Sequence, residues 1–462
     1  MTSSRLIPLI IASALFMENM DGTIIATSLP AIARDLGTDA IVLKLAFTTY
    51  LLSLTVFIPV SGWLADRFGA RHVFRAAVAI FTLGSIACGL SASLGELVAA
   101  RGLQGVGGAM MVPVGRLILL RTVPKSELVD ALAWLTIPAL LGPLVGPPVG
   151  GFVTDTFGWR WIFWMNLPFG ILAIVLASLY MPDARVDRVP PLDVKGFFLS
   201  GAGLSALVFG FTVLGRDLLP GWSPVALIVI GLVLCGFYVR HAMAVETPIL
   251  DLRLLRIETF RVGVTAGSLF RIGVGAVPFL LPLMFQLAYG MSAFHSGLIT
   301  FVAAAGAISM KFGAAWLIRR FGFRRLLMVN GLLACVSILA MGLLSSATPW
   351  VAAAFVLFIG SFLRSLQFTA LNAMAYSDID HAQASYATSL YTVAQQLSLS
   401  MGVVLAAFVL EGAQWWRAEN TLTGADFTIA FCVVAAVSAM SVLQFIALSP
   451  RAGEAVSGMK SD

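Results

Sequence analysis

Fourteen long apolar runs divide this chain, and they restrict its possible folds more than any other feature. As an α-helix, each run is long enough to cross roughly 30 Å of hydrocarbon at about 1.5 Å per residue. A helix satisfies its own backbone hydrogen-bonding groups, which lipid cannot do, and the runs lack the period-two alternation of a membrane β-barrel. We therefore predict an all-α polytopic membrane protein. Its fourteen transmembrane helices are expected at about 6–30, 41–64, 73–93, 95–120, 131–154, 161–180, 194–215, 223–242, 261–289, 295–318, 325–345, 349–374, 386–411 and 427–448.

Charged residues make up only 11% of the chain, against roughly 25% in soluble domains. Of the 29 Lys and Arg residues, 20 lie on the side of the N-terminus, five on the other side and four inside the runs. By the positive-inside rule, this bias predicts that both termini are cytoplasmic. The net charge of +6 therefore reflects topology, and no nucleic-acid partner is expected. We expect a multi-pass protein of a bacterial cytoplasmic (inner) membrane, surrounded by lipid.

An internal repeat indicates two halves. Residues 62–71, GWLADRFGAR, align with residues 315–324, AWLIRRFGFR, at six of ten positions and an offset of 253. The simplest account is two six-helix halves repeated in parallel, with a helix pair inserted between them. The predicted divisions are an N-terminal half at 1–181, an inserted helix pair with cytoplasmic linkers at 182–260, a C-terminal half at 261–450 and a cytoplasmic tail at 451–462.

The first copy of this loop carries the most specific local pattern. Gly62 is expected to let two helices approach closely, and Gly69 to permit a tight turn. Asp66, Arg67 and Arg71 are expected to form a charge network that holds the halves in one state and releases them in the other. Ordinary solvated loop charges are the alternative.

The fourth and fifth predicted helices carry polar or conformationally unusual residues. Arg101 and Gln104 share a helix face, and a charge inside the membrane usually faces an aqueous cavity. Alternatively, Arg101 snorkels to the outer surface. The fifth helix has a bare glycine stripe and internal prolines, which suit a gate, a tight seam between the two halves or a simple packing kink. The residues assigned to it are Gly142, Gly146, Pro147, Gly150 and Gly151.

Two carboxyl groups lie midway along the first helix, one turn apart. Glu18 and Asp21, together with Arg101, form the predicted proton-coupling site. A carboxyl group shielded from water binds a proton more readily, and a proton moving inward through 100 mV gains roughly 2.3 kcal/mol. In the alternative interpretation, one or both carboxylates are structural and bond to a neighbouring helix.

The second half supplies most of the predicted substrate cavity. Its polar residues within apolar runs, together with Gln104 from the first half, are Arg271, Lys311, Arg364, Gln367 and Gln395. The intramembrane charges are four cations, against Glu18, Asp21 and the near-terminal Glu411. These cations either pair with the carboxylates or bind an anionic substrate, so we favour anionic or neutral compounds.

Five segments in order resemble a known family. They are MDGTIIATSLP (20–30), GWLADRFGAR (62–71), LVAARGLQGVGGA (97–109), GPLVGPPVGG (142–151) and WRWIFWMNLPFG (159–170). Together they resemble the major facilitator superfamily, specifically the multidrug transporters of its 14-helix drug:proton antiporter branch. Arg319 replaces Asp66 in the second loop, and Glu18 and Asn19 are additional polar groups.

The resemblance implies the major facilitator fold and secondary active transport by alternating access. It implies export of small molecules, either drug-like compounds or organic anions, in exchange for protons. The proton gradient is the energy source, and no cofactor or metal is expected. A monomer is expected, since the two halves already form a complete pathway.

Three other functions are alternatives. An intramembrane enzyme is disfavoured because no HExxH, GxSxG or His cluster is present. A non-transporting receptor or scaffold would need neither a protonatable pair nor a gating helix. An importer of the same superfamily differs only in direction, for which the fifth-helix pattern is the guide.

Overall fold

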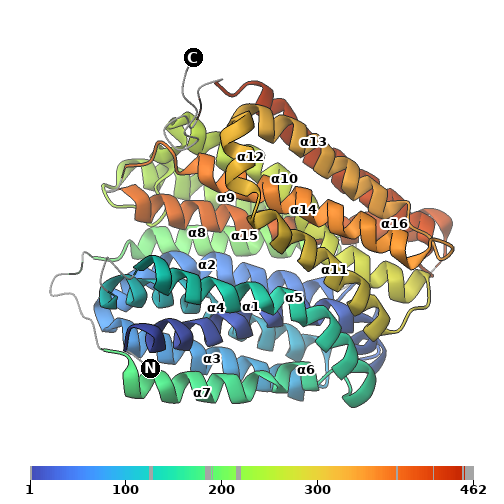
Figure 1. The fold of residues 1–462 in the computed structure, drawn as a ribbon, viewed down its shortest axis with the longest axis horizontal. Helices are drawn as coiled ribbons and strands as arrows, with labels where there is room; N and C mark the ends of the chain where they lie inside the picture. Colours follow the sequence, from blue (N-terminus) through green and yellow to red (C-terminus); the bar gives the residue numbers. More distant parts are fainter. Residues whose placement is uncertain are drawn as a thin grey trace. The chain divides into compact units, whose positions relative to one another are not determined.

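A computed structural model describes residues 3–123, 128–182, 189, 191–214, 220–380, 383–419, 421–449 and 452. Within these ranges all regular secondary structure is helical, and the helices run side by side as long rods (Figure 1). The all-α fold class predicted from the sequence is therefore confirmed. Most of the predicted tail at 451–462 lies outside the described residues.

The first nine α-helices are α1 (Ser3–Asp35), α2 (Lys44–Phe68), α3 (Ala70–Leu90), α4 (Leu94–Thr122), α5 (Leu128–Phe157), α6 (Trp161–Trp164), α7 (Asn166–Tyr180), α8 (Val194–Val213) and α9 (Ser223–Ala244). The remainder are the short helix η1 (Leu252–Arg256), α10 (Glu258–Leu283), the π-helical turn η2 (Met284–Ala288), α11 (Ala293–Lys311), α12 (Ala314–Phe321), α13 (Phe323–Gly342), α14 (Trp350–Ala375), α15 (Ala384–Arg417) and α16 (Gly424–Ile446).

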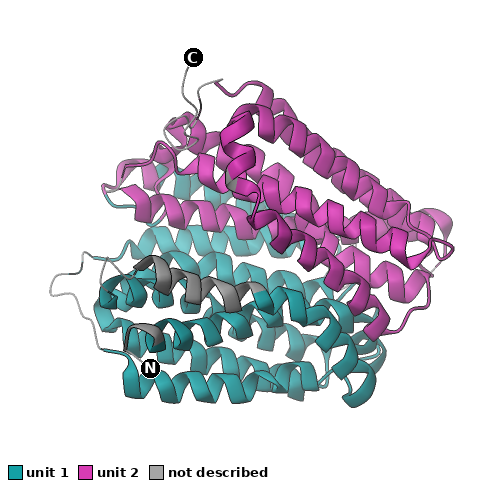
Figure 2. Ribbon diagram, viewed as in Figure 1, with its two compact units in different colours: residues 1–241, 247–249 teal, residues 242–246, 250–462 magenta. Residues whose placement is uncertain are grey.

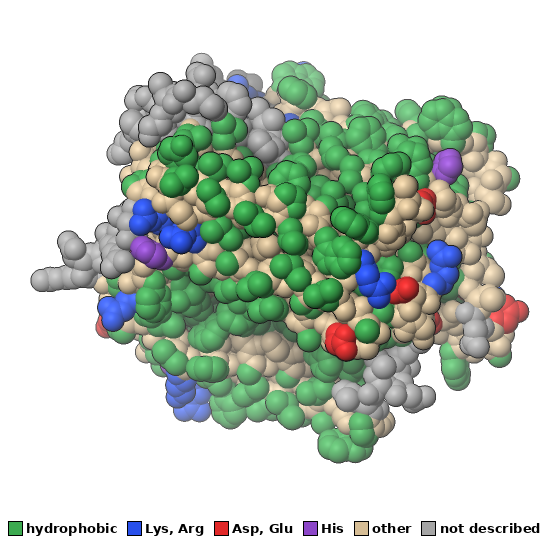
Figure 3. Space-filling view, turned by 90° about the horizontal axis from the view of Figure 1, so that it is seen from below, with side chains coloured by type: hydrophobic (Ala, Val, Ile, Leu, Met, Phe, Trp, Pro, Cys, Tyr) green, Lys and Arg blue, Asp and Glu red, His purple; other side chains and the backbone are tan. Residues whose placement is uncertain are grey.

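Thirteen segments of the described chain are helical, long and apolar enough to cross a membrane. Each coincides with one of the fourteen predicted runs. The fourteenth run, 131–154, falls on α5, which is a continuous helix of 30 residues. One face of the surface carries a broad band of hydrophobic side chains, with charged groups toward its two ends (Figure 3). This is the surface expected of a multi-pass membrane protein.

The chain packs into two compact units (Figure 2). Residues 1–241 with 247–249 form unit 1, and residues 242–246 with 250–462 form unit 2. These units follow from packing alone, so the domain boundaries predicted from the sequence remain predictions. Helix α8 packs against α2 within unit 1.

The two units repeat one pattern of helix pairing. In unit 1, α1 packs on α5, α7 and α4, while α4 also packs on α2 and α3, and α3 on α7. In unit 2, α10 packs on α15, α16 and α14, while α14 also packs on α11 and α13, and α13 on α16. Each helix of unit 2 thus has the neighbours of its counterpart, as an internal sequence repeat requires.

Aromatic and long aliphatic side chains fill the interior of each unit. Phe74 and Phe81 of α3 are fully buried in the core of unit 1, and Phe270 of α10 and Leu327 of α13 in that of unit 2. Since lipid tails are as apolar as these side chains, close van der Waals packing is the main force that holds such helices together.

A glycine ends the second helix of each half. Gly69, between α2 and α3, has φ of 89°, and Gly322, between α12 and α13, has φ of 68°. An L-residue with a side chain is strained at such angles, so glycine permits the sharp reversal at both places. The two residues are aligned in the sequence repeat, which therefore extends to the backbone conformation.

Candidate functional site

Asp21 lies at the centre of a buried polar network in unit 1. Its Oδ2 accepts a 2.6 Å hydrogen bond from Arg101 Nη1 of α4, with both side chains closed off from solvent. Its Oδ1 accepts 2.9 Å bonds from Gln104 Nε2 and from Asn166 Nδ2, at the start of α7. All three partners donate, so both oxygens of this carboxyl group accept hydrogen bonds.

A second layer of contacts fixes these donors. Ser85 Oγ of α3 accepts from Gln104 and Asn166 and donates to the carbonyl oxygen of Phe163. The guanidinium of Arg101 lies 4.1 Å from the centroid of the Tyr50 ring on α2. The structure therefore brings together the predicted Asp21, Arg101 and Gln104.

Asn166, Ser85 and Tyr50 were missed as members of this network. Asn166 had a signal in the sequence, because it is the one amide in the segment WRWIFWMNLPFG. Small hydroxyls and tyrosines inside apolar runs are common, so Ser85 and Tyr50 had none. Arg101 does not snorkel to the surface.

Glu18 differs from Asp21, although the two are one turn apart. Its side chain is partly buried, and Oε2 is shielded from solvent without a hydrogen-bond partner. Oε1 lies near Gly108 of α4, where an added Cβ would be 3.7 Å from it and 3.2 Å from the Tyr50 hydroxyl. The charged groups that act on it are Asp21 and Arg116. Glu18 is thus a carboxyl group without an ion-pair partner among the described residues.

The glycine stripe of α5 seats the helix that carries both carboxyl groups. A Cβ at Gly142 would lie 2.9 Å from the carbonyl oxygen of Phe16 and 3.0 Å from the amide nitrogen of Met20. Cβ atoms at Gly146 and Gly150 would collide with the next two turns of α1. The bare stripe therefore forms a tight seam with α1 inside unit 1, whereas the sequence predicts a seam between the two halves. Gly151 is buried beside it, and Pro147 is half-buried.

The loop motif holds a different ion pair from the one predicted. Asp66 Oδ1 accepts a 2.6 Å bond from Arg121 Nη2 at the end of α4, and both side chains are partly exposed. Arg67 is exposed, and among the described residues no ion pair joins its side chain to Asp66. A Cβ at Gly62 would meet no atom within 4 Å, so the expected close approach is not present in this conformation.

Arg71 has a structural contact that recurs in the other unit. Its Nη1 donates to the carbonyl oxygen of Met181, just after α7, at 3.2 Å. Arg324, the aligned residue, donates to the carbonyl oxygen of Ile446 at the end of α16, at 2.8 Å. Both arginines therefore satisfy a carbonyl at the end of the sixth helix of their half.

Arg271 is fully buried in α10 and has no acidic partner among the described residues. Its Nη2 donates to the Tyr391 hydroxyl of α15, in a short bond, and to Asn372 Oδ1 of α14 at 3.4 Å. Nε and Nη1 have no hydrogen-bond partner. The guanidinium lies 5.0 Å from the ring centroid of Phe368 and 4.6 Å from that of Tyr391.

Lys311, at the end of α11, also contacts α14. Its Nζ donates to Thr369 Oγ1 at 3.0 Å, and the side chain is exposed. Thr369 follows Phe368 directly and is three residues before Asn372, so Arg271 and Lys311 contact α14 within one turn.

Arg364 and Gln367 are both buried on α14, but their side chains contact different residues. Arg364 Nη1 lies 3.5 Å from the sulfur of Met341, and no acidic group pairs with it among the described residues. Gln367 accepts from Asn330 Nδ2 at 2.8 Å and donates to the carbonyl oxygen of Leu327, so it is a structural link between α13 and α14. Gln395 is half-buried on α15, one turn beyond Tyr391.

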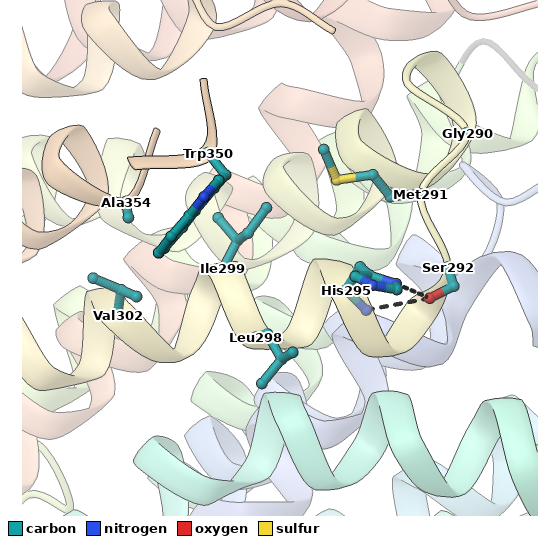
Figure 4. A pocket seen from close by; sticks show the side chains of 9 residues that line it. All are labelled: Gly290, Met291, Ser292, His295, Leu298, Ile299, Val302, Trp350 and Ala354. Atoms are coloured by element: carbon teal, nitrogen blue, oxygen red, sulfur yellow. Dashed lines mark hydrogen bonds between the residues drawn. The ribbon is translucent and has the colours of Figure 1, made fainter. Parts of the chain in front are cut away.

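An apolar hollow of about 680 Å³ lies at the N-terminal ends of α11 and α14 (Figure 4). His295 and Ser292, joined by hydrogen bonds at the start of α11, form its polar rim. The remaining lining residues are Gly290, Met291, Leu298, Ile299, Val302, Trp350 and Ala354. None of the predicted cavity residues lines it, so it is separate from the site around Arg271.

Comparison with known proteins decides the family. The family model for the Major Facilitator Superfamily matches residues 11–403. The chain belongs to the major facilitator superfamily. This superfamily member is 35% identical over 443 residues to a multidrug resistance protein named MdtD from Escherichia coli O6:H1, covering 94% of this chain and 93% of the relative. It is also 35% identical to an MdtD from Serratia proteamaculans, covering 94% and 92%.

Solved structures of the superfamily share the fold. The chain matches a D-xylose-proton symporter with a TM-score of 0.70 at 15% identity, covering 98% of this chain and 99% of that one. It matches the peptide transporter POT in complex with sulfate with a TM-score of 0.71 at 15% identity, covering 98% and 96%. At these identities the likeness shows the major facilitator fold alone, which confirms the predicted architecture.

Family membership fixes the coarse function of this superfamily member. It is a multi-pass membrane transporter for small molecules, and its relatives and fold are those of transporters, which are not enzymes. No group of three or more His, Cys, Asp or Glu side chains suited to a metal is found in the described ranges.

Proposed function

We propose that this transporter exports small molecules in exchange for protons, and that Glu18 binds and releases the proton. It acts as a monomer in a bacterial cytoplasmic membrane, with both termini in the cytoplasm. The export direction is supported by the multidrug resistance names of its relatives and by the fifth-helix pattern. The proton gradient supplies the free energy, roughly 2.3 kcal/mol per proton for 100 mV.

One contrast carries the proposal. Asp21 has a buried counter-ion and three donors, so its negative charge is already stabilised in place. Glu18 has a shielded oxygen without any partner. Either protonation or a bonding partner in another conformation would relieve the cost of that unpartnered oxygen. Asp21 and Arg101 then have a positioning role, since their ion pair fixes α1 against α4.

Alternating access sets the direction in which Glu18 passes its proton. A proton that reaches Glu18 from the outer side and leaves toward the cytoplasm moves down the electrochemical gradient. If the inward-open and outward-open states differ in proton affinity at Glu18, each cycle couples one proton to one conformational change. The Tyr50 hydroxyl beside the same glycine is placed to bond Glu18 as this change occurs.

Everted membrane vesicles test the coupling. In vesicles with an acidic interior, the wild-type protein should accumulate probe compounds, and collapse of the gradient should stop the accumulation. We would use ethidium as a lipophilic cation and benzoate as an aromatic anion. The Glu18→Gln variant should lose gradient-driven accumulation but keep exchange of labelled for unlabelled compound at equal pH.

A matched control is Glu246→Gln, which makes the same replacement of a carboxylate by an amide at an exposed site. It should accumulate the probes as the wild type does. The proposal fails if Glu18→Gln still accumulates them under the gradient, or if wild-type vesicles accumulate neither probe.

A further inference from the structure

We infer that Arg271 anchors the carboxylate of an aromatic organic acid, which makes organic anions the substrate class of this transporter. The inference rests on the proposed function only in that the protein transports small molecules. It does not depend on which group carries the proton or on the direction of transport.

The first observation is an uncompensated buried charge. Arg271 is fully buried, and neither Nε nor Nη1 has a hydrogen-bond acceptor. No carboxylate lies within ion-pair distance of it among the described residues, whereas Arg101 in unit 1 has Asp21. A buried guanidinium without a counter-ion is costly, and an anion that supplies both charge and acceptors removes that cost.

The second observation is the aromatic surrounding. Phe368 and Tyr391 lie against the guanidinium, and Tyr391 continues into a ring cluster with Tyr376 at 5.3 Å and Phe260 at 6.2 Å. A planar guanidinium matches a carboxylate in geometry. The adjacent rings offer surface for an aromatic body, so the site fits an aromatic acid better than a small inorganic anion.

The third observation is a second cation near the same turn of α14. Lys311 bonds Thr369, the neighbour of Phe368, and it too lacks an acidic partner among the described residues. Arg364, one turn before Phe368 on α14, contacts the Met341 sulfur and has no acidic partner among the described residues. The three cations within the apolar runs of unit 2 thus lack acidic partners among the described residues, which favours anions over organic cations.

Gly267 keeps Arg271 in its present position. The two residues are one turn apart on α10, and a Cβ at Gly267 would lie 2.6 Å from Arg271 Nη1. A side chain there would push the guanidinium away from its ring contacts. Because Nε and Nη1 are closed off from solvent, an anion reaches them only when the helices separate, as alternating access requires.

Equilibrium binding to the purified full-length protein tests the inference without any gradient. Titration calorimetry would compare benzoate with benzamide, which has the same ring but no charge. The wild-type protein should bind benzoate at least about tenfold more tightly than benzamide. Arg271→Gln should abolish this preference, whereas Arg261→Gln, an exposed arginine on the same helix, should keep it.

A second variant covers the case in which Arg271→Gln fails to fold. Gly267→Ala retains the charge but displaces the guanidinium, and it should weaken benzoate binding about tenfold. The inference is overturned if wild-type protein binds neither compound or both equally, or if the folded variants bind benzoate as the wild type does. The calorimetry uses no proton gradient and the vesicle assay requires one, so failure of this site and failure of proton coupling give different results.

Discussion

Arg101 and Arg364 occupy the same place in two copies of an Arg-x-Leu-Gln sequence, but only Arg101 has a carboxylate beside it. The copies are residues 101–104 and 364–367, on α4 and α14. At the offset that aligns the two loops, Glu18 corresponds to Arg271. The arginine of the Arg-x-Leu-Gln sequence is thus kept in both units, whereas the acidic position of Glu18 in unit 1 carries the basic Arg271 in unit 2.

The two carboxyl groups of α1 should respond in opposite ways to neutralisation. Asp21→Asn leaves Arg101 buried without a counter-ion, which should lower the free energy of unfolding by ~3–5 kcal/mol. Glu18→Gln removes a carboxyl group with no ion-pair partner and should leave the thermal midpoint in detergent unchanged or higher. Intrinsic tryptophan fluorescence during heating measures both.

A variant that neutralises both members of the Asp21–Arg101 ion pair provides the control. A double variant, Asp21→Asn with Arg101→Gln, should recover part of the stability lost in Asp21→Asn, since it removes the orphan cation. Equal destabilisation by Glu18→Gln and Asp21→Asn would contradict the separate roles assigned to them.

Two glycines of unit 1 should differ sharply when replaced by alanine. Gly142→Ala places a methyl group 2.9 Å from the carbonyl oxygen of Phe16, an overpacking that should cost ~1–3 kcal/mol of unfolding free energy. Gly62→Ala meets nothing within 4 Å and should stabilise α2 by about 0.5–1 kcal/mol. Thermal midpoints of the two variants give the comparison, and similar values would rule out the seam described here.

Much of the fold followed from the sequence because lipid imposes a strong rule on it. Apolar runs of sufficient length must be helices, so their number and limits could be read directly. The network around Asp21 was partly predictable for the same reason. A charged residue inside an apolar run, such as Arg101, needs a partner, and Asp21 was one of few acids available.

The partners that were missed lie on other helices at distances along the chain that no pattern reveals. Asp66 was expected to interact with the arginines of its own loop, but it pairs with Arg121, 55 residues away. The choice depends on how α2 and α4 pack together; at Gly105, for example, an added Cβ would lie only 2.7 Å from the Tyr50 carbonyl oxygen. Packing of this kind cannot be derived from one helix at a time.

The Asp66–Arg121 pair should affect transport more than stability. Both side chains are about 30% exposed (31% and 28%), and an ion pair at that exposure contributes at most about 1 kcal/mol. A bias of ~1 kcal/mol between two transport states changes their ratio about fivefold. We therefore expect Asp66→Asn to alter the transport rate severalfold with little change in thermal midpoint.

Exchanging the two charges distinguishes the effect of the Asp66–Arg121 ion pair from the effect of each residue alone. Asp66→Arg combined with Arg121→Asp should restore most of the rate that either change alone removes. If the double variant is as slow as the worse single variant, the contact between α2 and α4 is not what sets the rate.

Asp193 should make stability depend on pH at the start of α8. Burial opposes its ionisation, but hydrogen bonds from His241 and the amides of Gly196 and Ile249 hold its pKa below the ordinary value of 3.8. A carboxyl group with a lowered pKa stabilises the folded state fully above its unfolded pKa. The stabilisation is lost as the pH falls from 3.8 through the lower pKa of the folded state.

Thermal midpoints between about pH 7 and pH 3 would measure this effect. Asp193→Ala should lose ~0.5–2 kcal/mol near neutral pH, since it removes the helix cap together with the other bonds. Its difference from the wild type should shrink as the pH falls below 3.8, where protonation of Asp193 weakens the wild-type contacts. Asp380→Ala, at an exposed site, should show no such difference. A gap between wild type and Asp193→Ala that remains undiminished in acid would mean that these contacts do not depend on the ionised carboxylate.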